Sequence, residues 1–156
     1  NDVICFSTSP LTEALTLCGP IEIDLSTSIS TTDADYIVKL IDVFPDEDSK
    51  QAGYEMLVRG DIMRGRYRNS FTKPEPFAPN KMARVRFSLA DVAHTFPKGH
   101  RIMVQIQSSW FPLADRNPQQ FVNIYRCRPG DFVPTTVRIL HDATHASKLI
   151  LPVLRP

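Results

Sequence analysis

The segment FPKGHRIMVQIQSSWFPLADRNP, residues 96–118, contains a tight turn, a strand and a polar corner in this order. The turn is predicted at residues 97–100, where proline restricts φ and Gly99 can adopt a positive φ at little cost. Residues 101–107 then have the sequence RIMVQIQ, in which every second side chain is Ile or Val. Because successive side chains of a strand point to opposite faces, this alternation predicts a half-buried β-strand.

The same alternation recurs along the chain between turn-forming residues. The sequence PDED at 45–48 predicts the turn of a hairpin, and the prolines at 74, 76 and 79 exclude a central strand there. Further strands are predicted at residues 21–32, 36–44, 54–58, 82–89, 133–140 and 149–154. Eight or nine short strands with hardly any helical periodicity predict an all-β fold, an antiparallel β-sandwich.

Two segments interrupt this pattern of strands. Gly60, Gly65 and the basic run at residues 64–68 predict an irregular, cationic section. Residues 91–96 separate two predicted strands and are expected to form a single helical or 3₁₀ turn.

Length and charge limit the classes of function. The 156 residues are enough for one domain, which buries roughly 70% of the surface of its unfolded chain. The 18 basic and 17 acidic residues are interspersed and give a net charge of +1, which predicts no nucleic-acid partner and no anionic membrane surface. The short apolar runs predict neither a signal peptide nor a membrane-spanning helix, although a signal can precede these residues in a longer protein.

Three cysteines, Cys5, Cys18 and Cys127, form an odd set without a CxxC pair. This pattern argues against a disulfide framework and against a zinc ribbon. The three are therefore predicted to be free thiols in the core.

A Ser-His-Asp triad can be drawn from Ser108 or Ser109 with His100 and Asp115. On an α/β scaffold the nucleophile lies in a G-x-S-x-G turn, because small neighbours let the backbone bend sharply. None of the six glycines fits that spacing. The serines are therefore predicted to end a strand, and no residue of the chain is predicted to be catalytic.

Two other groups of polar residues suggest chemistry. His141 and His145 stand four residues apart, a spacing that suits zinc on a helix. A predicted strand runs into this segment and a clear third ligand is missing, so a polar loop is predicted instead of a metal site. Asp115-Arg116-Asn117 predicts a structural corner, tied together by charge-assisted hydrogen bonds.

Trp110 and Phe111 directly follow the predicted strand at 101–107 and are predicted to pack in the core or against another domain. Exposed aromatic side chains also bind sugars in carbohydrate-binding sandwiches. A carbohydrate-binding module that uses these two residues with Tyr67 and Tyr125 is therefore the alternative interpretation. An oligomerisation element is a third.

Several motifs, taken in order, carry a resemblance that covers the whole chain. They are DVICFS (2–7), KLIDVFPD (39–46), GRYRNS (65–70), GHRI (99–102), SSWFP (108–112), DRNPQ (115–119), FV (121–122) and LPV (151–153). Together they resemble the C-terminal non-catalytic domain of the X-Pro dipeptidyl-peptidase and cocaine esterase superfamily. The α-amino-acid ester hydrolases and glutaryl-cephalosporin (7-ACA) acylases are the most similar branch.

This resemblance implies a jelly-roll sandwich of the galactose-binding-domain type, with residues 1–156 forming a single domain of a larger hydrolase. The implied parent is a serine hydrolase that cleaves acyl esters or amides, of the dipeptidyl-peptidase or β-lactam acylase type. In that family the triad and the substrate-binding carboxylates precede this segment, so no catalytic, cofactor-binding or metal-binding residue is expected here. The implied partners are the upstream α/β-hydrolase and cap domains, with homo-oligomerisation as a further option, and a periplasmic or secreted location is favoured.

Overall fold

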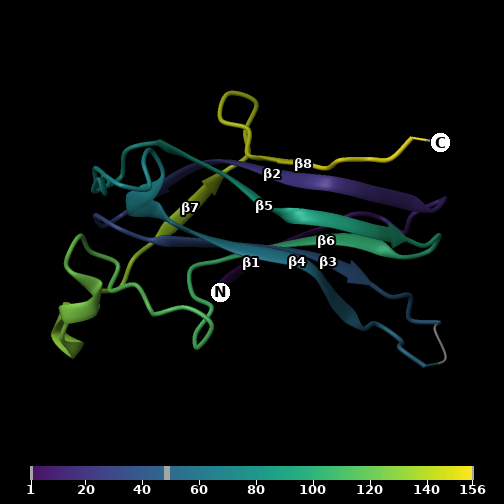
Figure 1. Ribbon diagram of the computed structural model, residues 1–156, viewed down its shortest axis with the longest axis horizontal. Helices are drawn as coiled ribbons and strands as arrows, with labels where there is room; N and C mark the ends of the chain where they lie inside the picture. Colours follow the sequence, from purple (N-terminus) through teal and green to yellow (C-terminus); the bar gives the residue numbers. More distant parts are fainter. Residues whose placement is uncertain (1, 48–49, 156) are drawn as a thin grey trace.

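Alternating apolar and polar residues build two antiparallel β-sheets that pack face to face (Figure 1). The computed structural model describes residues 2–47 and 50–155. Their strands are β1 (Val3–Ser7), β2 (Leu15–Ile29), β3 (Asp35–Val43), β4 (Glu55–Arg64), β5 (Ala83–Phe96), β6 (Arg101–Gln107), β7 (Val137–Leu140) and β8 (Lys148–Ile150). Three 3₁₀ helices, η1 (Gly65–Tyr67), η2 (Ile124–Arg126) and η3 (Pro129–Asp131), lie in the connections. The predicted all-β sandwich is confirmed.

The long strand β2 organises the second of the two sheets. The first sheet has the strand order β1-β6-β3-β4, and the second has the order β5-β2-β7. β7 pairs with residues 26–29 of β2, whereas β8 pairs with residues 22–24. β7 and β8 therefore lie one after the other along the same edge of β2, separated by the loop at residues 141–147.

Aliphatic and aromatic side chains, most of them from β2, β3, β5 and β6, fill the space between the sheets. Tyr36 can lie in this core because its hydroxyl group has a hydrogen-bonding partner there, Thr27 Oγ1, at 3.1 Å. Burial raises the pKa of Tyr36 to about 12. The buried apolar residues of β2, β3, β5 and β6 include Leu17, Ile21, Ile23, Leu25, Ile29, Val38, Leu40, Val85, Leu89, Val92, Phe96, Ile102 and Ile106.

The predicted turn and strand at residues 97–107 are confirmed. Gly99 has a φ of +88°, which glycine adopts without the steric penalty of a side chain. β6 then buries Ile102 and Ile106 and pairs with β1 on one side and with β3 on the other. This segment therefore lies inside the first sheet.

Two segments that were expected to be irregular are strands. The expectation of a helical or 3₁₀ turn at residues 91–96 is wrong, because β5 continues to Phe96 and buries Val92 and Phe96 in the core. Pairing with residues 15–19 of β2 supports this extension. Gly60 also lies within β4, so the irregular section begins only at η1.

Three strands are shorter than predicted at one end. β2 ends at Ile29, β7 begins at Val137, and β8 ends at Ile150. The prolines at 74, 76 and 79 lie outside the strands, as predicted. The predicted turn at 45–48 belongs to the β3–β4 connection, but Asp48 falls outside the described residues.

The cysteines do not lie in the core. Cys5 and Cys18 are exposed and Cys127 is half-buried, so the prediction of core positions is wrong. The physical reason is the pleat, because Cys18 follows the buried Leu17 and therefore points to the opposite face of β2. All three are free thiols, as predicted.

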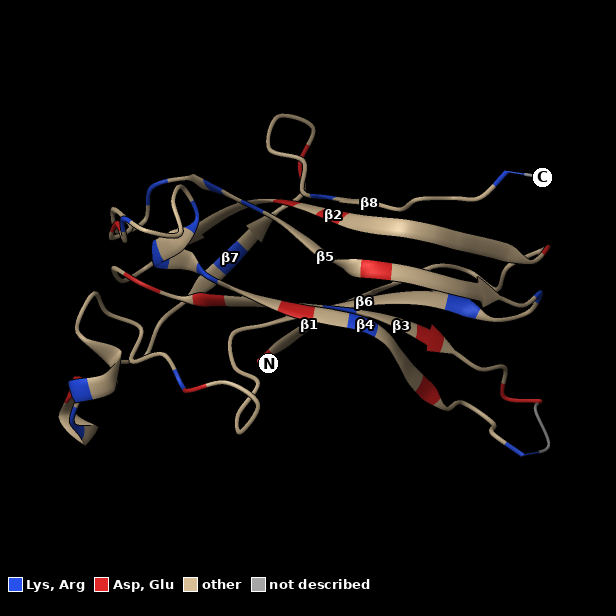
Figure 2. Ribbon diagram, in the orientation of Figure 1, with Lys and Arg blue, Asp and Glu red and all other residues tan. Residues whose placement is uncertain are grey.

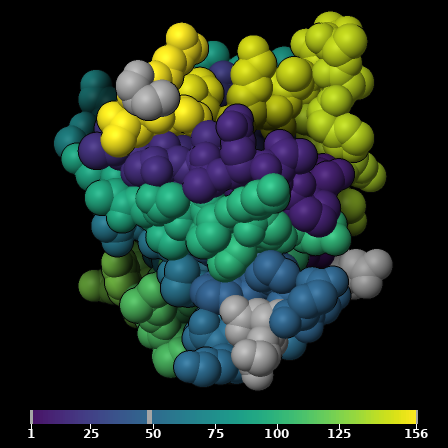
Figure 3. Space-filling view, turned by 90° about the vertical axis from the view of Figure 1, so that its right-hand side faces the viewer, coloured from purple at the N-terminus to yellow at the C-terminus, as the bar shows by residue number. Residues whose placement is uncertain are grey.

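The two ends of the sandwich differ. Figure 3 shows one end, where the C-terminal segment, β2, the β5–β6 turn and the β3–β4 hairpin lie in successive layers. The opposite end carries the connections at residues 65–82 and 108–136 (Figure 1). Acidic and basic residues are intermixed over the strands (Figure 2). Within the part of the chain that the structure describes, no helix has the length and hydropathy to cross a membrane.

Candidate functional site

The residues of the drawn triad lie far apart. His100, at the start of β6, forms a 2.7 Å hydrogen bond with Asp42 Oδ1, and the other oxygen of Asp42 lies 2.9 Å from His94 Nε2. Ser108 follows the far end of β6, a strand of 7 residues. At about 3.3 Å per residue, this separates Ser108 from His100 by roughly 26 Å. His100 therefore bonds within the fold, and it forms no triad with Ser108 and Asp115.

The two histidines at 141 and 145 belong to the loop between β7 and β8, as predicted. Asp142 Oδ1 accepts hydrogen bonds from the backbone N–H groups of Thr144 and His145, at 2.8 and 2.9 Å. These backbone bonds, with a further contact from the His145 ring, hold the pKa of Asp142 below its usual value. Among the residues described, no three His, Cys, Asp or Glu side chains are placed to hold a metal ion.

Trp110 lies on the outer surface of the first sheet. Its ring sits over Gly60, where an added Cβ would come within 3.0 Å of Cη2, and Lys39 Nζ lies 4.5 Å from the ring centroid. Phe111 is 66% exposed. The core is therefore excluded for both aromatic residues, and contact with another domain remains the prediction.

Tyr67 and Tyr125 lie together with Phe121 around a hollow of about 410 Å³ beside η1 and η2. Trp110 and Phe111 do not line this hollow. The four aromatic residues considered for sugar binding are therefore not gathered on one surface.

Asn117, in the predicted corner, is buried and contacts two carboxylates. Its Nδ2 donates to Asp33 Oδ2 at 3.0 Å and to Asp35 Oδ1 at 2.8 Å. The structural corner thus exists, but the carboxylates come from the β2–β3 connection and from β3, not from Asp115. The guanidinium of the neighbouring Arg116 lies over the Phe132 ring, with Cζ 5.3 Å from the ring centroid.

Arg66, in η1, completes this network from a third part of the chain. Its Nε and Nη2 lie 2.7 and 2.6 Å from Asp33 Oδ2, and its Nη1 donates to the backbone oxygen of Val122 at 2.8 Å. The guanidinium also lies 4.8 Å from the centroid of the Phe121 ring. Because Arg66 and Asp33 are both buried, this ion pair ties residues 117–122 to the end of the first sheet.

The network creates an unusual electrostatic environment. Burial raises the pKa of Asp35 to about 6, although the hydrogen bond from Asn117 and the charge of Arg64 oppose this rise. Asp33 Oδ1 is buried and has no hydrogen-bond partner among the described residues. Asn117 could thus be predicted from the sequence as part of a corner, whereas its partners Asp33, Asp35 and Arg66 were not predicted. The motif DADY, residues 33–36, could have indicated these partners, because it places two carboxylates at the start of an otherwise apolar strand. Buried carboxylates require cationic or amide partners.

The segment fixed by this network presents large apolar side chains to solvent. We name residues 110–133 the interface loop. Within it, Phe111, Leu113 and Tyr125 are 66%, 68% and 84% exposed, and Phe121 and Phe132 are partly exposed. Large exposed apolar groups on a braced segment are typical of surfaces that contact another protein.

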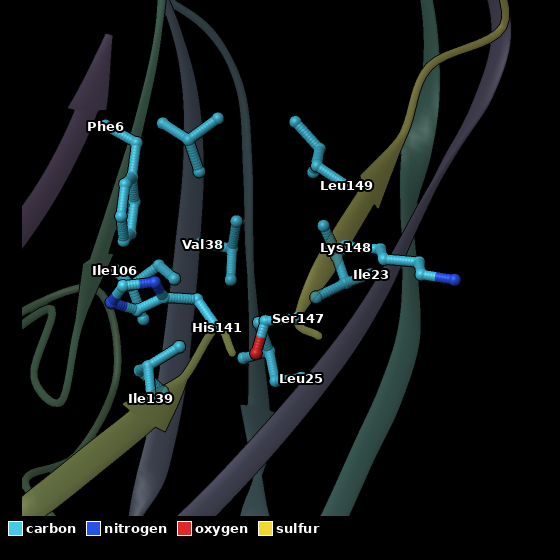
Figure 4. A pocket seen from close by; sticks show the side chains of 11 residues that line it. Phe6, Ile23, Leu25, Val38, Ile106, Ile139, His141, Ser147, Lys148 and Leu149 are labelled. Atoms are coloured by element: carbon cyan, nitrogen blue, oxygen red, sulfur yellow. The ribbon is translucent and has the colours of Figure 1, made fainter. Parts of the chain in front are cut away.

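A second hollow, of about 380 Å³, opens between the two sheets next to β1 and the loop at 141–147 (Figure 4). Phe6 of β1 and Leu149 of β8 stand on opposite sides of it. Its other lining residues are Ile23, Leu25, Val38, Val104, Ile106, Ile139, His141, Ser147 and Lys148. The described lining contains no carboxylate, so this hollow offers an apolar contact surface and not an acid–base pair.

Known proteins share both the sequence and this architecture. Residues 1–150 match the family described as the X-Pro dipeptidyl-peptidase C-terminal non-catalytic domain. Cocaine esterase of Rhodococcus sp. (strain MB1 Bresler) is 33% identical over 155 residues, which cover 99% of this chain and 26% of that protein.

Two solved structures superpose closely on this chain. An α-amino acid ester hydrolase is 46% identical with a TM-score of 0.95, over 98% of this chain and 26% of that one. An aminopeptidase from a marine sediment archaeon, Thaumarchaeota archaeon, is 43% identical with a TM-score of 0.95, over 99% of this chain and 26% of that one. The chain thus spans about a quarter of the length of these relatives. By sequence and by fold, it belongs to the family of C-terminal non-catalytic domains of X-Pro dipeptidyl-peptidase and cocaine esterase type hydrolases.

Proposed function

We propose that residues 1–156 form one domain of a longer serine hydrolase, and that this domain supports the catalytic unit mechanically. The relatives that it matches are esterases, hydrolases and an aminopeptidase about four times its length, which supports this proposal. The parent would cleave acyl esters or amides through an acyl-enzyme, with the nucleophile and its base upstream of this chain. Dipeptidyl-peptidase and acylase activities are the two proposed classes.

The observation that carries this proposal is the interface loop. Its apolar side chains are exposed, yet the loop is tied to the sheet by a buried ion pair and by Asn117. Bracing of this kind lowers the entropy that is lost when a surface binds, because the contacting groups are already held in place. The interface loop is therefore proposed to pack on the upstream α/β-hydrolase and cap domains.

Tyr125 provides the sharpest test of this contact. Its side chain is 84% exposed, so its replacement removes few contacts within the isolated chain. In the longer protein, an aspartate at this position would place a charge in an apolar contact between domains. Tyr125→Asp is therefore expected to lower the temperature at which the longer protein loses hydrolase activity by several degrees. The unfolding midpoint of the isolated chain is expected to stay unchanged.

The matched control is Tyr54→Asp. Tyr54 is 52% exposed and directly precedes β4. The first residues of β4 lie at the end of the sandwich opposite the interface loop (Figure 1). The Tyr54→Asp variant is expected to leave the inactivation temperature of the longer protein unchanged. Equal inactivation temperatures for Tyr125→Asp and the parent would rule out the proposed contact.

The non-catalytic role has a separate test. The purified chain is expected to show no turnover of a p-nitrophenyl ester above the buffer rate. Turnover that is abolished by Ser108→Ala or Ser109→Ala would refute the support role, because it would place a nucleophile within this domain.

A further inference from the structure

The two sheets of the sandwich are not equally complete. The first sheet has four strand positions, whereas the second has three, because β7 and β8 share one edge of β2. A jelly roll distributes eight strands over two sheets, four in each. The second sheet is therefore one strand short of that arrangement among the described residues.

The contacts between the sheets show which position is vacant. β4 lies opposite β5, because Arg59 Nε donates to the backbone oxygen of Asp91 at 2.7 Å. β3 lies opposite β2, where Tyr36 and Thr27 share a hydrogen bond. β6 lies opposite β7, because Ile106 and Ile139 line the same two hollows. By this order, β1 faces the position beyond β7, which no described strand occupies.

β1 has the exposure expected of a strand with nothing opposite it. All five of its residues are exposed, although Val3, Ile4, Cys5 and Phe6 are apolar. Ile4 and Phe6 line hollows between the sheets, so Val3 and Cys5 point to the outer face. An exposed apolar strand at a sheet edge is a liability that proteins usually cover.

The space opposite β1 is a groove made of two hollows, of which the larger is lined mainly by apolar side chains. The 380 Å³ hollow and a neighbouring hollow of about 120 Å³ share Ile106 and Ile139. The smaller one is more polar, because its lining includes Asp2, Asp35, Gln107, Ser108 and Thr135 beside Ile4 and Val137. Its position places the beginning of β1 beside the beginning of β7, and Phe6 lies next to His141, with ring centroids 6.1 Å apart. β1 and β7 therefore run in the same direction along the two sides of the groove.

We propose that the polypeptide directly before Asn1 in the longer protein fills this groove as a β-strand, antiparallel to β7 and hydrogen-bonded to its free edge. This inference rests on the proposed function only in assuming that such a polypeptide exists. A strand that precedes β1 and joins it by a turn runs opposite to β1, and hence antiparallel to β7. Its inward side chains cover Ile4 and Phe6.

The groove favours this occupant over others. Asp2 lines the groove, so the preceding residues reach it without a long connection. The relatives hold about three quarters of their length outside the matched region, so polypeptide is available. The lining of the larger hollow carries one lysine and no carboxylate, which suits apolar side chains of a strand. The smaller hollow is lined by Asp2 and Asp35, which suits polar residues at one end of that strand.

Hydrogen–deuterium exchange tests the proposal. The chain is compared with a version extended by about thirty residues encoded before Asn1, enough for one strand and a turn. In the extended version, the amide hydrogens of residues 137–140 are expected to exchange more slowly, by a factor of about ten or more. The variant Ile4→Asp, on the groove face of β1, is expected to abolish this protection. Val3→Asp, on the outer face of the same strand, is expected to preserve it.

Three results would overturn the proposal. The first is equal exchange of residues 137–140 in the two versions, and the second is equal loss of protection in both variants. The third is a dimer of the unextended chain that Ile4→Asp dissociates in light scattering, because a second copy would then occupy the groove.

Should Ile4→Asp fail to fold, a peptide of the twenty residues before Asn1 is titrated into the unaltered chain. Protection of residues 137–140 by that peptide, but not by a scrambled one, is expected, and its absence overturns the proposal. None of these measurements reports hydrolase activity, so failure here leaves the support role unaffected.

Discussion

Replacement of Arg66 by alanine removes the cation from the network that holds the interface loop. In the folded chain Arg66 gives two contacts to Asp33 Oδ2, at 2.6 and 2.7 Å, and one hydrogen bond to the Val122 carbonyl, at 2.8 Å. Without them, the buried carboxylate of Asp33 keeps only the Asn117 amide as a partner among the residues that the structure describes. The substitution therefore leaves a buried charge almost uncompensated.

The size of the effect follows from the burial of both partners. The side chains of Arg66 and Asp33 are 9% and 0% exposed, so water screens this pair little. Removal of one partner from a buried ion pair costs about 3–5 kcal/mol. For a domain of this size, about 2–4 °C per kcal/mol converts this loss into a fall in melting temperature of roughly 6–20 °C.

Urea and thermal unfolding of the purified chain, followed by circular dichroism at pH 7, measure this loss. Arg126→Ala is the matched control, because Arg126 is an exposed arginine of the interface loop. It is expected to change the free energy of unfolding by less than about 0.5 kcal/mol. The double variant Arg66→Met with Asp33→Leu is expected to recover most of the loss, because neither member of the pair is then left as an unpaired buried charge.

Two outcomes would refute this reasoning. One is an Arg66→Ala chain within about 1 kcal/mol of the unaltered chain, a difference typical of an exposed pair. The other is a double variant as unstable as Arg66→Ala, which would mean that the cost comes from lost packing and not from an unpaired carboxylate.

Three further changes probe other parts of the fold. Burial raises the pKa of Asp35 to about 6 from 3.8, so its contribution to stability is complete below pH 3.8 and is lost as the pH rises through about 6. Urea midpoints should therefore fall between about pH 4 and 6 for the unaltered chain and fall less for Asp35→Asn; equal slopes would contradict this. Gly65→Ala should destabilise by about 1–3 kcal/mol in urea titration, because its Cβ would lie 2.5 Å from a backbone oxygen, whereas Gly130→Ala, with open space around it, should be silent. Gly60→Ala should shift the emission of Trp110, the single tryptophan, because the new methyl group displaces its ring, and an unchanged spectrum would show that the ring does not rest there.

Patterns within one segment are sufficient to predict much of the fold. The alternation in residues 101–107 and the turn at Gly99 both depend on neighbouring residues, and both are confirmed. The expected turn at residues 91–96 is wrong because its outcome depends on pairing with residues 15–19, some 75–80 positions away. The family could also be predicted, since the order and spacing of short motifs carry it.

The sequence by itself therefore determined the all-β character, the position of the strand at residues 101–107 and the family. These depend on local alternation and on the order of motifs. Only the tertiary structure decided which carboxylates face Asn117 and Arg66, that Trp110 rests on Gly60, and that β1 lies opposite an open groove. Each of these contacts joins residues about 30 to 130 positions apart. Their partners are selected by the packing of two sheets, which no local pattern specifies.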